Sequence, residues 1–219
     1  MVSSRLAVAV ALGGLLAACG DANPPSPFPQ TPGASPLSLA PESMVLRPAQ
    51  LPGYVRTANA TVDPNTLAEQ ESDQTLVGTF QREGLQVGAR ATYSDPNKGN
   101  VPTPFATVIS QILMFTDAHG AGSFYSDEQA RRSTAPAGGT LSTLSNLPLG
   151  GADAIVGLAV SVPAQASGDP ASRALFAIIR RGRVVAELFG GGSAQTATDA
   201  RFLALVTVQE QQLDAQPAS

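Results

Sequence analysis

The stretch ALFAIIRRGRVVAELF, residues 174–189, points to the class of fold. Two apolar segments rich in β-forming residues, 174–179 and 184–189, flank a short basic connection that contains Gly182. Two such segments joined by a short glycine-containing turn are typical of a β-hairpin. The sequence therefore predicts two adjacent antiparallel strands at this point of the chain.

Further strands are predicted on the N-terminal side of this hairpin. Residues 85–93 alternate, with Leu85 and Ala89 on one side of the strand and Arg90 on the other, as in a half-buried strand. Residues 106–115 and 154–162 are strongly apolar and predict two more strands, and residues 54–56 predict a short one.

Helices are expected between these strand runs. Asp63 followed by Pro64 predicts the start of a helix that is broken near residues 72–73 and ends before Gly84. Asp117 is expected to cap a helix over 118–132, and residues 196–213 have helical spacing. Between the hairpin and this last helix, residues 190–193 (GGGS) are interpreted as a strand-to-helix turn rather than an anion-binding loop.

Runs of strands separated by single helices favour an α+β fold. We expect a single domain with a twisted, mainly antiparallel sheet and two or three helices packed on one face. Each half of the chain ends in a helix, which suggests a weak structural duplication without a sequence repeat.

The N-terminus has the features of an export signal. Arg5 precedes an uncharged apolar run, residues 6–16, which is too short to cross a bilayer as a helix. The run ends in Leu16-Ala17-Ala18-Cys19, which closely resembles the lipobox of bacterial lipoproteins. The resemblance implies that residues 1–18 are removed and that Cys19 is acylated, anchoring the protein to a membrane on the extracytoplasmic side. An ordinary secretory peptide with an incidental cysteine is the alternative.

Residues 19–44 are expected to form a tether rather than part of the domain. Proline is concentrated in this region, as in NPPSPFP at residues 23–29, and no apolar period is present. Proline density favours extended, solvated backbone. The globular α+β domain is therefore predicted to cover residues 45–219.

Several features of that domain resemble a known class. They are LPGY at residues 51–54, the strand before Asp117-Ala118, and the closing hairpin, glycine run and long helix. Together they look like small extracytoplasmic α+β domains, including lipoproteins of the Mog1/PsbP-like fold and the sensor domains of some membrane kinases. The resemblance implies a cleft between sheet and helices that takes an apolar or amphipathic molecule. Those sensor domains carry paired disulfides, which a chain with one cysteine cannot form.

Composition argues against several functions. The formal net charge is −4 and Lys98 is the only lysine, so a nucleic-acid partner is not expected. His119 is the only histidine and is expected at a helix terminus or on the surface rather than in a catalytic site. With one histidine and an acylated cysteine, the chain offers too few of the ligands that zinc sites use. The sequence predicts no enzyme activity, no cofactor and no metal.

Three polar clusters are assigned plain structural roles. Residues 95–100 lack the spaced acidic ligands of a calcium loop and are interpreted as a turn. Glu69, Glu71 and Asp73 are interpreted as a solvated helix face. The arginines at positions 180, 181 and 183 are interpreted as a solubilising hairpin tip.

Two functions are left. The first is a non-catalytic binding or sensing domain for a small apolar or lipidic ligand, in a pocket lined by Phe80, Ile112, Phe124 and Phe202. The alternative is a protein-protein interaction or scaffold lipoprotein of the cell envelope. In that case the same residues would be tightly packed, and an apolar patch would lie on the surface.

Overall fold

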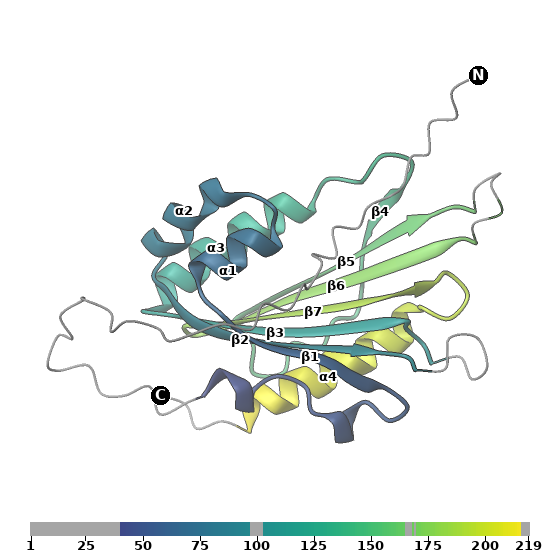
Figure 1. Ribbon diagram of the computed structural model, residues 1–219, viewed down its shortest axis with the longest axis horizontal. Helices are drawn as coiled ribbons and strands as arrows, with labels where there is room; N and C mark the ends of the chain where they lie inside the picture. Colours follow the sequence, from purple (N-terminus) through teal and green to yellow (C-terminus); the bar gives the residue numbers. More distant parts are fainter. Residues whose placement is uncertain (1–39, 97–102, 165–167, 169, 216–219) are drawn as a thin grey trace, which may run out of the picture.

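The computed structural model describes residues 40–96, 103–164, 168 and 170–215. Within them, seven strands form one antiparallel sheet in the order β1-β2-β3-β7-β6-β5-β4 (Figure 1). The strands are β1 Val55–Val62, β2 Leu85–Ser94, β3 Thr107–Phe115, β4 Thr140–Thr143, β5 Ala154–Val162, β6 Ser172–Arg181 and β7 Val184–Ser193. The predicted single α+β domain with an antiparallel sheet is confirmed.

The β6–β7 hairpin is confirmed, with Arg181 paired to Val184 across its turn. The structure differs from the expectation at residues 190–193, which continue β7: all four pair with β6, and Gly190 and Gly191 also pair with β3. Glycine is needed there because a Cβ on Gly190 would lie 3.0 Å from Phe105 and 3.2 Å from Phe202. The short edge strand β4 was not predicted, since it contains one apolar residue in four.

Four α-helices accompany the sheet in the described part of the chain: α1 Pro64–Gln70, α2 Val77–Arg82, α3 Ala118–Arg132 and α4 Asp199–Asp214. The predicted caps are confirmed, because Asp63 accepts a hydrogen bond from the Thr66 amide and Asp117 from the Gly120 amide, both at 2.8 Å. The predicted helix break is also confirmed at Ser72, whose φ of 55° lies in the left-handed region. Short 3₁₀ helices are η1 Pro41–Ser43, η2 Pro48–Gln50 and η3 Gln74–Leu76.

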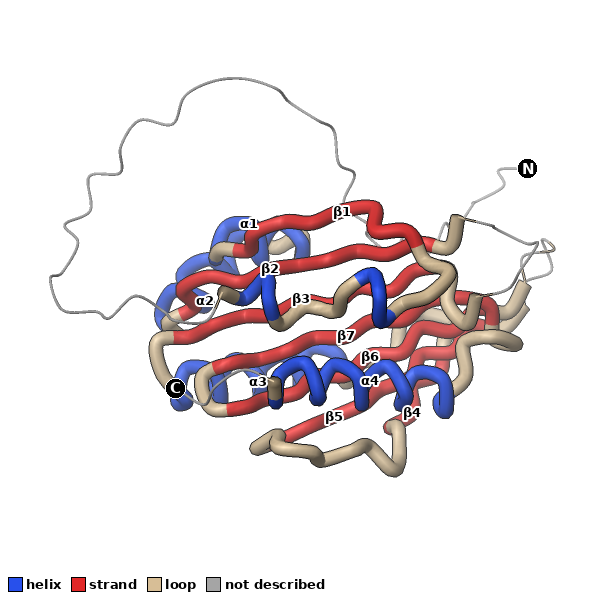
Figure 2. Tube along the Cα trace, turned by 90° about the horizontal axis from the view of Figure 1, so that it is seen from below, coloured by secondary structure: helices blue, strands red, loops and turns tan. Residues whose placement is uncertain are grey.

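The helices cover both faces of the sheet, which corrects the expectation of a single helical face. In Figure 1, α1, α2 and α3 lie above the sheet and α4 lies below it. Figure 2, seen from below, shows α4 running along the strands on its own face. The reason is visible in β3, where Ile112 joins the core under α4 and the next residue, Leu113, joins the core under α3. A strand that is apolar on both sides must be covered on both sides.

A bulge changes the face of one residue in β2. The pairing of β2 with β3 shifts between Leu85 and Val87. As a result, Leu85 packs in the core on the α3 side, whereas Val87 and Ala89 pack in the core on the α4 side. The uniform alternation expected over residues 85–91 is therefore interrupted by the irregular pairing.

The fold begins a few residues before the expected boundary at residue 45. Met44 is buried, and its carbonyl oxygen accepts a hydrogen bond from Gln209 of α4 at 2.8 Å. Gln209 in turn accepts one from Ser110 of β3 at 2.7 Å, and Ser110 accepts one from the Leu46 amide at 3.0 Å. This buried network joins the N-terminal segment to the sheet and to α4. Cys19 and the signal-peptide prediction lie outside the described residues.

Helices α1, α2 and α3 cover only one end of their face of the sheet. Figure 1 shows them gathered over the left half, while β4, β5 and β6 extend past them to the right. The strand surface beside the helices is therefore where an opening can form on this face.

Candidate functional site

A cavity of about 350 Å³ lies on the α1–α3 face, at the border between the helices and the uncovered strands. Its walls come from the end of α1, the end of α3 and strands β2, β3, β6 and β7. It is partly open to solvent. This volume falls at the small end of the range for small-molecule sites.

Two rows of side chains cross the sheet and form the floor. In the first row, Arg90 of β2 pairs with Gln111 of β3, which pairs with Glu187 of β7. In the second row, Ile109 of β3 pairs with Phe189 of β7, which pairs with Phe176 of β6. Residues two apart on a strand share a face, so the polar row and the apolar row lie about 7 Å apart.

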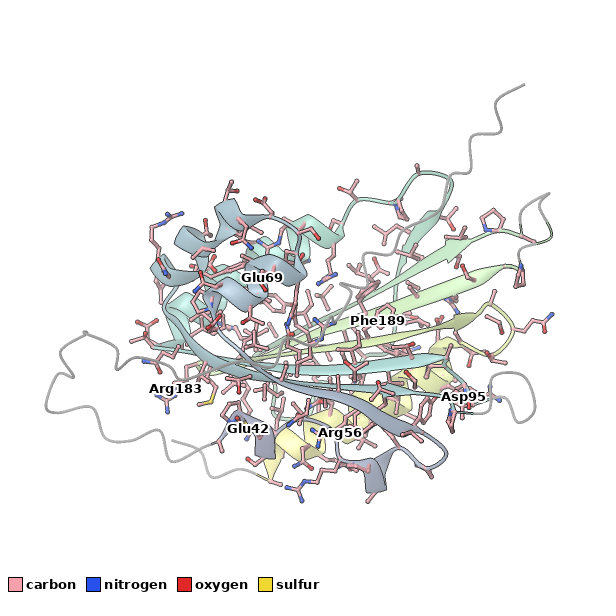
Figure 3. The ribbon with its side chains drawn as sticks, viewed as in Figure 1. Glu42, Arg56, Glu69, Asp95, Arg183 and Phe189 are labelled. Atoms are coloured by element: carbon pink, nitrogen blue, oxygen red, sulfur yellow. The ribbon has the colours of Figure 1, made fainter. Side chains whose placement is uncertain are left out.

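The apolar row forms a half-buried aromatic surface. The rings of Phe176 and Phe189 are 5.0 Å apart between centroids and are tilted by 53°. Both rings are only partly covered, in contrast to the fully buried phenylalanines of the two cores. Figure 3 shows Phe189 over the sheet, to the right of helix α1, which carries Glu69.

Arg132, near the end of α3, joins the polar parts of the site. It pairs closely with Glu128 one turn earlier and lies 3.5 Å from Glu71 at the end of α1. Its guanidinium is 3.9 Å from Glu187 on β7 and stacks 5.0 Å from the centre of Phe176. One cation therefore contacts three carboxylates and one ring, which draws α1, α3 and the sheet together. The expectation that Glu71 lies on a solvated helix face is wrong, whereas Glu69 and Asp73 are exposed.

Glu187 is the most perturbed carboxyl group of the site. Burial raises its pKa most, the nearby Glu128 carboxylate raises it too, and Arg132 lowers it; the net pKa is about 8. Its side chain is 13% exposed. One of its oxygens accepts a hydrogen bond from Gln111 at 2.6 Å, while the other has no hydrogen-bond partner. The amide oxygen of Gln111 also has no hydrogen-bond partner, even though Gln111 is buried, with 5% of its surface exposed.

Arg90 differs from the other two arginines of this region. Arg131 and Arg132 both pair with Glu128. Within the described residues, the guanidinium of Arg90 has no hydrogen bond and no ion pair, although Glu187 and Glu71 are near enough to interact with it electrostatically. Burial lowers its pKa. A partly buried cation without a direct partner is a group that an incoming anion can satisfy.

The four residues predicted to line a pocket do not line this cavity. Phe80 and Phe124 lie in the core under α3, with ring centroids 5.9 Å apart. Ile112 and Phe202 lie in the core under α4, on the opposite face of the sheet. All four are essentially fully buried, so the structure divides them between two packed cores.

The other singled-out residues have varied positions. His119 is exposed in the first turn of α3, away from the cavity lining. Asp95 is buried at the start of its loop, and residues 97–100 lie outside the described part. Across the described ranges there is no group of three or more potential metal-ligating side chains. No helix there is long and apolar enough to cross a membrane.

Sequence reasoning missed the residues that do line the cavity, although a signal was present. Gln111 and Glu187 are polar residues inside strongly apolar strands, where a charged or amide side chain is expensive unless it has a role. Arg90 was placed on the outer side of its strand. That side turned out to be the one that α1 and α3 border.

The fold is similar to that of the extracellular domain of PknH from Mycobacterium tuberculosis. The TM-score is 0.53 at 12% sequence identity, covering 81% of this chain and 98% of that one. No protein-family model matches the chain, and no curated protein matches it in sequence. At this identity the likeness shows a common fold. The resemblance to the Mog1/PsbP-like fold and to bacterial lipoproteins stays a prediction.

Proposed function

We propose that this chain is a membrane-anchored extracytoplasmic lipoprotein whose domain binds a small amphipathic molecule and catalyses no reaction. The observation that carries the proposal is the cavity itself. It combines a half-buried aromatic surface with a partly buried polar row that contains unsatisfied hydrogen-bonding groups. Ligand sites in proteins typically pair an apolar lining with a few polar groups of this kind.

The location rests on two independent features. The lipobox at Leu16-Ala17-Ala18-Cys19 supports export and acylation. The likeness in fold to an extracellular domain supports the same side of the membrane. Acylation of Cys19 with two or more chains would hold the domain stably at the bilayer.

The chemistry of the lining supports binding rather than catalysis. Among the described lining residues the only hydroxyl is Ser72, and no histidine or cysteine accompanies it. Glu71 lies 3.5 Å from Arg132, and Glu187 accepts a hydrogen bond from Gln111. A nucleophile with an adjacent base is what covalent catalysis requires, and the lining does not offer that pair.

Native mass spectrometry of the mature chain tests the proposal. The chain would begin at residue 19 and carry Cys19→Ser, so that no acyl group is present and all described residues are kept. We expect a small amphipath to remain bound after gentle purification from the native host. Ile109→Trp, which fills the cavity, should abolish that mass, whereas Ile109→Val should retain it. Retention by the tryptophan variant would place the ligand elsewhere.

The scaffold alternative predicted that Phe80, Ile112, Phe124 and Phe202 are tightly packed, which they are, and that an apolar patch is exposed. In the described part of the chain the exposed large apolar residues are Val55, at 51%, and Leu149, at 66%. They lie on β1 and on the connection between β4 and β5, at opposite ends of the sheet order. Two separate residues are ordinary for a protein surface.

A further inference from the structure

We infer that the ligand of this cavity carries an anionic head, a carboxylate or a phosphate, bound by Arg90, and a single apolar chain lying over Phe176 and Phe189. This inference rests on the proposed function, because it names the class of ligand for the same site.

The position of Arg90 is the first argument. It begins the polar row of the floor, beside Gln111, and its side chain lines the cavity. No described carboxylate forms an ion pair with it, whereas Glu128 engages both Arg131 and Arg132. A planar guanidinium presents paired donors that match a carboxylate or phosphate in two-point geometry. An anion would restore the interactions that Arg90 loses on leaving water.

The balance of charge in the lining is the second argument. The lining contains two arginines, Arg90 and Arg132, and two glutamates, Glu71 and Glu187. Arg132 is committed to Glu71 at 3.5 Å and to Glu128. Burial favours the neutral form of Glu187, which holds its pKa near 8. At neutral pH the charge left without a counterpart is therefore the positive charge of Arg90.

The place for an apolar chain is the third argument. Ile109, Phe189 and Phe176 are cross-strand neighbours and lie one row away from Arg90 along the strands. An anionic head on the polar row thus places the first carbons of an attached chain over the aromatic row. A cavity of about 350 Å³ is small for a lipid with several chains, so we assign a single-chain amphipath.

The test measures binding of matched probes to the mature Cys19→Ser chain by isothermal titration calorimetry, below their micelle concentrations. The probes share a dodecyl chain and differ in the head: dodecanoate, dodecyl phosphate, dodecanol and dodecyltrimethylammonium. Inorganic phosphate without a chain is the fifth ligand. Arg90→Gln removes the charge, Arg90→Lys keeps it, and Arg183→Gln on the hairpin turn is the control, with melting temperatures measured for all.

We expect one or both anionic probes to bind about 10- to 100-fold more tightly than dodecanol, as for a hydrogen bond to a charged group. Arg90→Gln should erase the preference for anionic probes while retaining dodecanol binding. Arg90→Lys should keep part of that preference, and Arg183→Gln should keep all of it. The two anionic probes then distinguish a carboxylate from a phosphate head.

Equal affinity for all heads, or a preference for the ammonium probe, would overturn the anionic head and leave the proposed function standing. Inorganic phosphate binding as tightly as dodecyl phosphate would overturn the role of the chain. Failure of every probe to bind would count against the proposed function as well.

Discussion

Replacing Glu187 by glutamine is the sharpest test of the charged cluster beneath the cavity. Glu187 lies among Glu128, Glu71 and Arg132, and burial raises its pKa from 4.5 to about 8. A carboxyl group whose pKa is higher in the folded state binds its proton more tightly there than in the unfolded chain. Its contribution to stability is then fully present below about pH 4.5 and is lost as the pH rises through about 8.

The size of the effect follows from that shift. At about 1.4 kcal/mol per pKa unit, ionising Glu187 in the folded protein would cost on the order of 5 kcal/mol. Water entering the cavity and closer approach of Arg132, now 3.9 Å away, would reduce this cost. We therefore expect the free energy of unfolding of the glutamine variant to exceed that of the wild type by on the order of 2–3 kcal/mol at pH 9. At pH 5, where Glu187 is still protonated in the folded protein, the two proteins should differ by less than about 1 kcal/mol.

Urea unfolding of the mature Cys19→Ser chain at pH 5, 7 and 9 measures the difference directly. Glu69→Gln on α1 is the matched control, because Glu69 is exposed on the solvent side of the helix (Figure 3). Glu69→Gln should change the free energy of unfolding little at any of the three pH values. A Glu187→Gln variant less stable than the wild type at pH 9 would refute the reasoning. That result would mean that ionised Glu187 and Arg132 form a net stabilising pair.

Five further substitutions separate the roles of other residues. Gly120→Ala should destabilise the fold by about 1–3 kcal/mol in urea unfolding, because a Cβ there would clash with the backbone carbonyl oxygen of Glu83 at the end of α2. Gly122→Ala in the same helix meets only the tip of an arginine at 3.1 Å and should stabilise by about 0.5–1 kcal/mol. Phe202→Ala, in a packed core, should lower the free energy of unfolding by about 3–5 kcal/mol. Phe176→Ala, on the cavity surface, should lower it by under about 2 kcal/mol but should impair ligand binding. Cys19→Ser in the full precursor should move the protein out of the carbonate-washed membrane fraction without changing its melting temperature, and retention there would contradict acylation.

Local features were predictable because they depend on neighbours in the chain. The hairpin over residues 174–189 and the strand over 154–162 follow from short apolar segments and turn residues. The caps at Asp63 and Asp117 need only an amide three residues away. The helix break at residues 72–73 is likewise local.

The side of the sheet on which each helix packs was not predictable in the same way. Each half of the sheet ends in a helix, α3 after β3 and α4 after β7, as the weak duplication suggested. The helices α3 and α4 nevertheless lie on opposite faces. The consecutive apolar residues of β3, from Ile112 to Phe115, are consistent with burial on both faces, but they predict a strand without saying which helix covers which face.

The candidate site shows the same division. Apolar residues at strand and helix positions predicted burial, and Phe80, Ile112, Phe124 and Phe202 are indeed buried. Burial by itself does not distinguish a core residue from a pocket residue. That distinction depends on where the helices stop covering the sheet.

By itself, the sequence determined strands β2, β3, β5, β6 and β7, the hairpin, the helix caps and the lipobox that predicts the anchor, because each depends on a few consecutive residues. Only the tertiary structure decided that β3 pairs with β7, which places Gln111 beside Glu187 although they are far apart in the chain. The pairing of β2 with β3 aligns Arg90 with them, and the β3–β7 and β6–β7 pairings place Phe189 and Phe176 one row away. The cavity exists because α1 and α3 end above those rows. Contacts between distant segments depend on how whole layers pack, and no local pattern of residues specifies them.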